Sequence, residues 1–435
     1  MDRHRVLRVL VPLLLAALLP AACASGCGST ATGSPGHGAT SDEGPWRLVA
    51  EIDDVQQIAF ADRDHGWLIR THHSDAAVSE GPGVWTSDDG GRTWTACDGR
   101  IESTTSWDAP APTVAKLVKP AFVTPLGRRT VVVAFQGSSK YEVVGGAGTY
   151  PPANKTPGGV LMTRDAGRRW TTCLRLPLRE VIAANCWTDA RHGWVLSFQG
   201  SFGPESRIAS LWTLRRTADG GRSWRELGQW EDPRDRNRLV TCPVGRMTMV
   251  DRRVGWELFL TPWDEAAESW SVMCRTPDGG QTWEPVKHLP VAGDEDGSTV
   301  RYATNPDGFQ ARGRDDVWCW MAIEPMMEGD TMWEGALWHT VDGGRSWEYA
   351  SIADPVDGAY FADDRRGWLA TDISRAGEAV LVTEDGGRTW QPELSVEGRF
   401  WSFVPAGDQI RLVVAPKVKY GEPGPYRLYE RAIDR

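Results

Sequence analysis

The sequence lacks the features that mark several common functions. It contains no Cys-x-x-Cys pair and no histidines at metal-binding spacing; His72 and His73 are adjacent, so in a strand they would face opposite sides. We therefore expect no metal site and no cofactor.

After residue 22, no apolar run approaches the length needed to cross a membrane. The rest of the chain is accordingly expected to be soluble.

Positive charge is also scarce. The 435 residues carry a formal net charge of −10, and removing the first 27 residues, which hold three arginines and one aspartate, changes it to −12. An acidic chain with no basic stripe is a poor match for a phosphate backbone. The composition therefore excludes nucleic acid as a partner.

Residues 1–27 resemble a lipoprotein-type signal segment. A basic start is followed by an apolar run from Val9 to Ala22 and then by small residues and two cysteines. Cys27 follows Ala-Ser-Gly and is the expected lipidation site; Cys23, with Pro20 where leucine is usual, is the alternative. An ordinary cleaved secretory signal is the second interpretation. We expect an extracytoplasmic protein, either membrane-anchored through the lipid or secreted.

Residues 28–44 are small and polar, so we predict a flexible tether, and residues 45–435 are predicted to form a single domain. An exported chain can form disulfides, and the six cysteines beyond the signal segment allow fifteen pairings. These cysteines are Cys97, Cys173, Cys186, Cys242, Cys274 and Cys319.

An octapeptide with the pattern Ser/Thr-x-Asp-x-Gly-x-x-Trp occurs six times. The last copy runs from Thr383 to Trp390 and follows a short apolar run, which is typical of a hairpin turn. The aspartate can accept hydrogen bonds from backbone N–H groups two or three residues on, glycine allows positive φ, and the tryptophan buries a large ring. We assign these residues to turn structure rather than catalysis: Asp89, Trp94, Asp165, Trp170, Asp219, Trp224, Asp278, Trp283, Asp342, Trp347, Asp385 and Trp390.

A second signature, ending in Gly-Trp, precedes most copies of the octapeptide. It runs from Phe60 to Trp67 and returns before Trp194, Trp256 and Trp368, with a weaker form ending at Trp318. Each unit reads as four strands, and such units in series predict a β-propeller. The predicted blades lie near 55–98, 112–176, 181–230, 243–288, 299–352 and 357–394.

The two ends of the chain predict a seventh blade. Arg399 to Val404, Ile410 to Ala415 and Tyr426 to Ala432 supply three strands, and Trp46 to Ile52 supplies the fourth. Pairing them closes the ring without a free edge. The prediction is an all-β, seven-bladed propeller of four-stranded antiparallel blades, closed by an N-terminal strand; six or eight blades are also compatible with the spacing.

The octapeptides resemble the Asp-box, or bacterial neuraminidase repeat, of β-propeller proteins. The combination with the Gly-Trp signature is similar to photosystem II assembly and stability factors, and the box alone is shared with sialidase-like propellers. The first resemblance implies a protein that holds other proteins. A sialidase would also need an early Arg-Ile-Pro, whereas Arg207-Ile208 is followed by Ala209. Sialidase activity is therefore not expected.

The long, variable connections are expected at the end of the blades opposite the boxes, where binding usually resides. Two of these loops combine aromatic and acidic residues and belong to consecutive blades. The candidate ligand-binding residues are Trp263, Asp264, Trp270, Glu324, Asp330 and Trp333. The competing interpretation is that the tryptophans pack their own loops and the acids are solvated.

The resulting functional prediction is a monomeric, non-enzymatic binding protein. Its partner would be a protein or a cell-envelope glycan held on the long-loop face, and it would meet the membrane only through its lipid. The alternative is a glycan-active hydrolase that uses loop carboxylates of blades 4 and 5; such a reaction needs two carboxylates at a defined separation.

Overall fold

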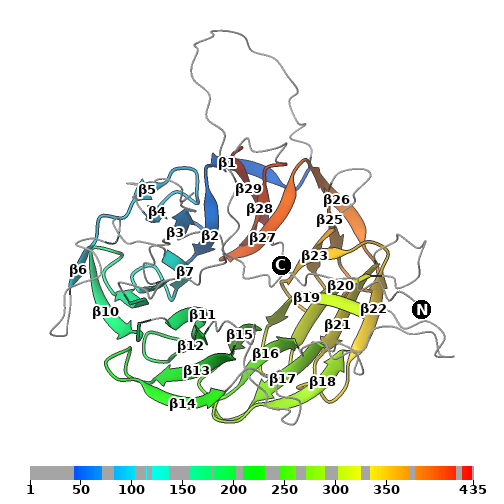
Figure 1. Cartoon of the computed structure of the whole chain (residues 1–435). Coiled ribbons are helices and arrows are strands. Elements are labelled where there is room, and N and C mark those ends of the chain that lie inside the picture. The colour runs from blue at the N-terminus through cyan, green and yellow to red at the C-terminus, as the bar shows by residue number, and fades with distance from the viewer. Residues whose placement is uncertain are drawn as a thin grey trace, which may run out of the picture.

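The computed structural model describes residues 44–70, 83–102, 114, 120–136, 157–178, 180–201, 209–230, 245–260, 271–289, 302–324, 334–371, 378–417 and 424–433. These residues form seven β-sheets arranged around a central axis (Figure 1). The predicted seven-bladed propeller is therefore confirmed. Within the described ranges, no helix is long and apolar enough to cross a membrane.

Blades 1 to 4 follow the chain from the inner strand to the outer strand. Blade 1 contains β2 (Val55–Phe60), β3 (Gly66–Arg70), β4 (Val84–Ser87) and β5 (Thr95–Ala96). Blade 2 contains β7 (Pro120–Pro125), β8 (Val131–Phe135), β9 (Gly159–Thr163) and β10 (Arg169–Arg175). Blade 3 contains β11 (Glu180–Trp187), β12 (Gly193–Ser201), β13 (Ala209–Thr217) and β14 (Arg225–Trp230). Blade 4 contains β15 (Gly245–Met249), β16 (Gly255–Leu260), β17 (Ser271–Thr276) and β18 (Glu284–Leu289).

Blades 5 and 6 repeat this order, and blade 7 joins the two ends of the chain. Blade 5 contains β19 (Tyr302–Ala311), β20 (Val317–Glu324), β21 (Glu334–Thr340) and β22 (Glu348–Ile352). Blade 6 contains β23 (Val356–Phe361), β24 (Gly367–Thr371), β25 (Glu378–Thr383) and β26 (Gln391–Val396). Blade 7 contains β27 (Arg399–Ala406), β28 (Gln409–Ala415), β29 (Tyr426–Ala432) and, outermost, β1 (Arg47–Ile52).

The N-terminal strand closes the ring as predicted. β1 pairs antiparallel with β29, with Arg47 opposite Glu430 and Ile52 opposite Tyr426. The strands that the structure describes lie between residues 47 and 432.

Blade 2 departs from the predicted four strands. A fifth strand, β6 (Arg100–Glu102), runs parallel to β10 on the outer edge of the blade. The chain crosses here from blade 1, whose own outer strand β5 is short. Gly99 permits the crossing, because a Cβ at this position would lie 1.8 Å from the Gly167 carbonyl oxygen.

Tryptophans of the Gly-Trp signature join neighbouring blades. Trp67, Trp194, Trp256, Trp318 and Trp368 are at most 3% exposed. Four of these rings lie near the box glycines of a following blade. Trp194, for example, donates from Nε1 to the Gly279 carbonyl at 2.8 Å. These four signatures therefore support the box of the next blade, which explains why the two motifs recur together.

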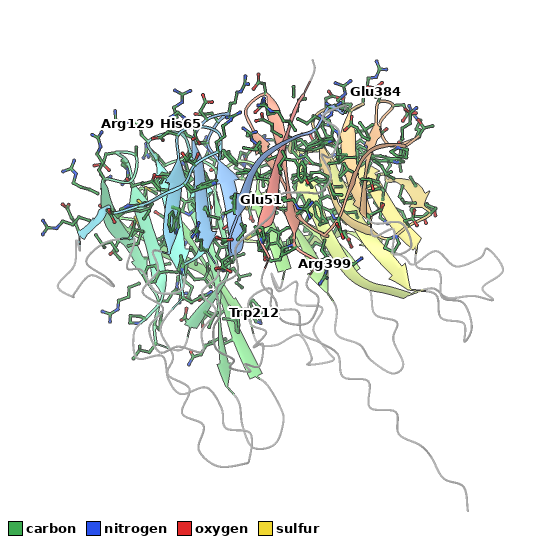
Figure 2. All side chains as sticks on the ribbon, turned by 90° about the horizontal axis from the view of Figure 1, so that it is seen from above. Glu51, His65, Arg129, Trp212, Glu384 and Arg399 are labelled. Atoms are coloured by element: carbon green, nitrogen blue, oxygen red, sulfur yellow. The ribbon has the colours of Figure 1, made fainter. Side chains whose placement is uncertain are left out.

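The two faces of the ring differ in the length of their connections. On one face, five residues join the first and second strands of blades 1 to 6, at 61–65, 126–130, 188–192, 250–254, 312–316 and 362–366, and the box turns join the third and fourth strands. We call this the turn face. Connections on the opposite, long-loop face range from two residues between β1 and β2 to the segment 136–158. In Figure 2, His65, Arg129 and Glu384 lie along the turn face, and Arg399 and Trp212 lie toward the other.

Candidate functional site

The six boxes form nearly identical turns. In the last one, the Thr383 hydroxyl donates to Asp385 Oδ1 at 2.9 Å and accepts from the Gly387 N–H at 2.9 Å. Asp385 also accepts from the Thr389 N–H and hydroxyl, at 2.9 and 2.6 Å. Its backbone donors lie three and four residues on, so the predicted donor three residues on is present and the second donor is the fourth residue rather than the second. The carboxylate nevertheless has the predicted turn-building contacts.

These contacts keep the box carboxylates ionised. Hydrogen bonds from the Thr389 hydroxyl and backbone lower the pKa of Asp385 to about 2. Bonds from Ser223 and Ser346 lower the pKa values of Asp219 and Asp342 equally, to about 2. A carboxylate whose oxygens already accept several hydrogen bonds is poorly suited to take a proton from a substrate.

The box of blade 2 reaches the same geometry with different residues. Arg169 occupies the position of the usual Ser or Thr, and its backbone N–H and Nε donate to Asp165 at 2.9 and 3.0 Å. The guanidinium thus replaces the missing hydroxyl. Ala166 occupies a glycine position and adopts φ of 60°, a left-handed conformation that is unfavourable for alanine.

The five-residue turns dock onto the boxes of their own blades. The carbonyl of the fourth turn residue accepts a hydrogen bond from the box backbone in blades 1 to 6, as in Gly90 N–H to Asp64 at 2.8 Å and Gly386 N–H to Arg365 at 2.8 Å. The second residue is an aspartate in four of these turns and binds the backbone of its own turn. Both turn types therefore lie at one end of each blade, as predicted.

Five of the six predicted ligand-binding residues lie outside the described residues: Trp263, Asp264, Trp270, Asp330 and Trp333. Glu324 is the last residue of β20, and its backbone pairs with Tyr302. Cys23 and Cys27 also lie outside the described residues, as does Cys242. Among the described cysteines, Cys97, Cys173, Cys186 and Cys274 are free thiols.

The structure identifies an aromatic site on the long-loop face that the sequence did not reveal. β27 is the inner strand of blade 7, and its pairing with β28 shifts register between Phe400 and Ser402, which leaves Trp401 in a bulge. Bulges re-aim side chains. Trp401 is 42% exposed, and its ring meets that of Tyr426 edge-on at 5.4 Å between centroids.

The inner strands of five other blades shift register at the corresponding point. The shifts lie at Gln56, Ala121, Ala183 and Asp357, and between Asn305 and Gly308 in blade 5. Among the bulge residues whose side chains are described, Asp357 and Trp401 are exposed, and they belong to adjacent blades. An aromatic face beside a carboxylate can stack on a ligand ring and accept its hydrogen bonds. No periodic pattern marks these bulges, so the sequence carries little signal for them.

A second feature that the sequence did not reveal is a cluster of arginines on the turns of blade 2. Five arginines and one carboxylate, Asp165, occupy residues 126–130 and 163–170. All five arginines are exposed. The expected absence of a basic stripe holds for consecutive sequence, but folding brings together two turns that lie far apart in the chain. We call this cluster the blade 2 arginine patch: Arg128, Arg129, Arg164, Arg168 and Arg169.

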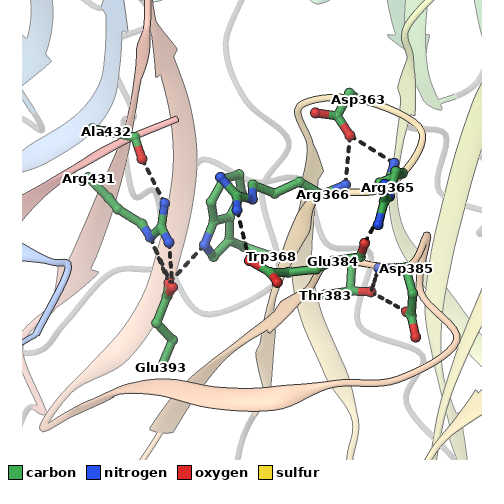
Figure 3. A network of polar contacts seen from close by, with 10 residues as sticks. All are labelled: Asp363, Arg365, Arg366, Trp368, Thr383, Glu384, Asp385, Glu393, Arg431 and Ala432. Atoms are coloured by element: carbon green, nitrogen blue, oxygen red, sulfur yellow. Dashed lines mark hydrogen bonds and ion pairs between the residues drawn. The ribbon is translucent and has the colours of Figure 1, made fainter. Parts of the chain in front are cut away.

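Blades 5 and 6 show a different charge pattern on the same face. A hollow of about 660 Å³ is lined there by three arginines and three carboxylates, Arg312, Asp363, Asp364, Arg365, Arg366 and Glu384. Arg366 Nη2 lies 2.7 Å from Glu384 Oε1, and Arg312 Nη2 lies 2.9 Å from Asp364 Oδ1 (Figure 3 shows the Arg366 side). These charges balance one another, unlike those of the blade 2 arginine patch.

One buried acid has the perturbed pKa that often marks an active site. Glu257 on β16 is 2% exposed, and burial raises the pKa of its carboxyl well above the usual range. It lies across the sheet from Met247 and Cys274, and burial together with the Glu257 charge raises the pKa of the Cys274 thiol to about 12. Because the side chain is enclosed in the core, it is not accessible to a substrate.

Comparison with known proteins adds information about the fold alone. No protein-family model matches the chain, and no curated protein matches it in sequence. Similar solved structures include a Dyadobacter fermentans protein of unknown function, with 14% identity over 90% of this chain and 100% of that one and a TM-score of 0.45. A GH74 xyloglucanase from Xanthomonas campestris has 14% identity over 89% of this chain and 54% of that one, with a TM-score of 0.42.

An α-L-arabinanase from Penicillium chrysogenum has 9% identity over 72% of this chain and 92% of that one, with a TM-score of 0.40. At these identities and scores, the similarity carries no argument about activity. The chain is a seven-bladed β-propeller with Asp-box-like turns, and its function has to be argued from its own surfaces.

Proposed function

We propose that this protein is a non-enzymatic, lipid-anchored binding propeller outside the cytoplasm. Its long-loop face would hold a protein or cell-envelope ligand. The observation that carries the proposal is the difference between the faces: in blades 1 to 6 the first turn of the turn face always has five residues, whereas the connections of the long-loop face vary widely in length. Rigid scaffolds commonly place binding residues on such variable connections.

The exposed aromatic site gives this face a specific contact. Trp401 lies near the start of inner strand β27, with Tyr426 beside it and Asp357 on the adjacent blade. A large exposed ring of this kind supports binding of a planar or sugar-like group. The box aspartates support a non-enzymatic role, since their oxygens are engaged in turn hydrogen bonds.

Ligand capture tests the binding proposal. The chain from Gly28 to Arg435 is used as bait for envelope extracts, as wild type and as Trp401→Ala and Tyr349→Ala variants. Tyr349 is a matched control, because it is 41% exposed on outer strand β22, compared with 42% for Trp401. A specific ligand should be lost with Trp401→Ala and retained with Tyr349→Ala. Equal capture by all three chains would contradict binding at Trp401.

Two further measurements address the alternative function and the anchor. A panel of glycosides is assayed with the wild type and with Glu324→Gln and Asp330→Asn variants; turnover that disappears in the variants would support the hydrolase and contradict the non-enzymatic proposal.

Incorporation of labelled palmitate should disappear in Cys27→Ser. Continued labelling with loss only in Cys23→Ser would assign the lipid to the alternative cysteine, and no labelling of the wild type would reject the anchor.

A further inference from the structure

Blade 2 adds two arginines, Arg164 and Arg169, at box positions where the other blades have neutral or acidic residues. Its five-residue turn has Gly127 where four other turns have aspartate, followed by Arg128 and Arg129. Its box has Arg169 in place of Ser or Thr. Blade 2 therefore loses the turn aspartate and adds two box arginines to the arginines that its turns share with other blades.

The blade 2 arginine patch is one continuous surface. The Ala166 N–H donates to the Arg129 carbonyl at 3.0 Å, which joins the two turns. Arg164 Nη2 donates to the Gly220 carbonyl at 3.3 Å and extends the contact to the turns of blade 3. There the Gly220 N–H donates to the Arg191 carbonyl at 2.9 Å, which adds another exposed arginine at the border.

Most of this positive charge is uncompensated within the described residues. Arg128 pairs with Asp62 at 2.6 Å, and Arg169 pairs with Asp165 at 3.0 Å. Arg129, Arg164 and Arg168 have no ion-pair partner among the described side chains. These three exposed guanidinium groups carry no balancing carboxylate, and Arg164 engages only the Gly220 carbonyl through Nη2. Their remaining N–H groups can meet phosphate oxygens, which guanidinium groups bind with strong, directional hydrogen bonds.

The chain enters the ring on this same face. Glu430 of β29 bridges Arg47, the first residue of β1, and Arg92 of the first box turn. Residue 46 therefore lies at the turn-face end of the outermost strand of blade 7. The segment 28–44, if fully extended, would reach roughly 60 Å. A lipid at Cys27 would consequently keep the attachment point on the turn face within roughly 60 Å of the membrane.

We propose that the blade 2 arginine patch rests on the anionic phosphate headgroups of the membrane that carries the lipid anchor. This inference rests on the anchored location in the proposed function and adds a second membrane contact. The turn face then lies toward the lipid, and the long-loop face with Trp401 points away from it, available to a ligand. Charged residues on distant blades add little to the attraction between the patch and the headgroups, because charges separated by more than about 8 Å are screened at physiological salt.

Vesicle sedimentation tests the inference without the lipid anchor. The chain from Gly28 to Arg435 is mixed with phosphatidylglycerol–phosphatidylcholine vesicles or with phosphatidylcholine alone. Arg129→Gln/Arg168→Gln removes two patch charges. Arg365→Gln/Arg388→Gln is the matched control, since these arginines occupy the same turn positions in blade 6, where acidic residues surround them.

Wild type should bind the anionic vesicles and release them at high salt. Loss of two surface arginines should weaken the vesicle partition coefficient by about 30-fold, and the control pair should change it less than about threefold. Thermal unfolding of both variants shows whether they remain folded. Equal weakening by both pairs would overturn the inference, because it would indicate binding through net charge alone.

Two other outcomes would also overturn it. If inorganic phosphate displaces the wild type when chloride at equal ionic strength does not, the patch binds a free phosphate ion. If the chain does not bind anionic vesicles but binds polyglutamate through Arg129 and Arg168, the patch is a binding site for an acidic protein. The palmitate assay measures lipidation of the chain independently of the vesicle assay. Failure of the headgroup contact can therefore be distinguished from failure of the proposed membrane-anchored location.

Discussion

Glu257 occupies a position that other blades fill with apolar or thiol side chains. The residue after the signature tryptophan is Leu68, Val195, Cys319 or Leu369 elsewhere, and each is buried. Glu257 Oε1 has no hydrogen-bond partner among the described residues. A buried carboxylate without a partner is costly, whereas the protonated acid is tolerated. Burial therefore favours the neutral form of Glu257, and ionising it costs stability.

Replacing this acid with an uncharged isostere should reveal that cost. The folded-state pKa of Glu257 lies above its unfolded value of 4.5, so the folded protein holds the proton more tightly. The resulting stabilisation is present at low pH and is lost as pH rises from about 4.5 toward the folded pKa. The difference in unfolding free energy between Glu257→Gln and wild type should grow by at most about 1.4 kcal/mol per pH unit.

Urea denaturation at several pH values measures this difference. Glu348→Gln on the exposed outer strand β22 serves as the control, and its stability should track the wild type throughout. A Glu257→Gln variant with the same pH dependence as the wild type would mean that the acid ionises in the fold through a polar contact beyond the described residues.

Among the elements, closure of the ring depends on one acid between blades 6 and 7. Glu393 of β26 accepts from Trp46 Nε1 at 2.7 Å, from Trp368 Nε1 at 2.9 Å and from Arg431 of β29 at 2.7 to 3.0 Å (Figure 3 shows the last two partners). The side chains of Glu393 and Arg431 are 9% and 8% exposed. The network joins β24 and β26 to the start of β1 and to β29, so it couples closure to the neighbouring blade.

Removing the carboxylate should leave a buried guanidinium without its charge partner. Glu393→Ala is expected to lower the unfolding free energy by about 3–5 kcal/mol, because an uncompensated buried charge is strongly destabilising. Glu397→Ala, at an exposed position just after β26, should change it by less than about 0.5 kcal/mol. Chemical denaturation compares the two, and similar small losses would show that Arg431 finds another partner.

For the whole molecule, the sequence was sufficient to predict the architecture because the repeat is encoded locally. Each box contains its own turn, and each Gly-Trp marks the strand that packs on the next blade. β6 was missed because it depends on Gly99 passing close to the Gly167 carbonyl, a contact between blades. The blade 2 arginine patch was missed for a related reason: its members lie on two turns that only the fold brings together.

The predicted ligand residues show the other limit of the sequence. Composition drew attention to the loops with Trp263 and Trp333, which lie outside the described residues. The aromatic residue that the structure exposes, Trp401, belongs to a strand and owes its exposure to a bulge. Strand periodicity predicts which face a residue occupies only while the register is regular, so a bulge hides such a residue from a pattern search.

The repeated boxes also predict how the whole ring responds to acid. Partial burial raises the pKa of Asp89, but hydrogen bonds from Thr93 and Ser87 outweigh it and lower the pKa to about 2, below its unfolded value of 3.8. Because the folded pKa is depressed, the stabilisation is present above pH 3.8 and is lost as pH falls toward 2. Six boxes share this chemistry, so the unfolding free energy should fall steeply in that window.

The slope of unfolding free energy against pH counts the protons taken up on unfolding. Between pH 4 and 2 we expect the wild type to take up several, and Asp89→Asn to take up roughly one fewer. Asp88→Asn changes the neighbouring, exposed position of the same turn, so its slope should match the wild type. If Asp88→Asn and Asp89→Asn behave alike, acid sensitivity arises from the net charge of the ring. A difference confined to Asp89 would assign it to the turns, because only that carboxylate closes the box.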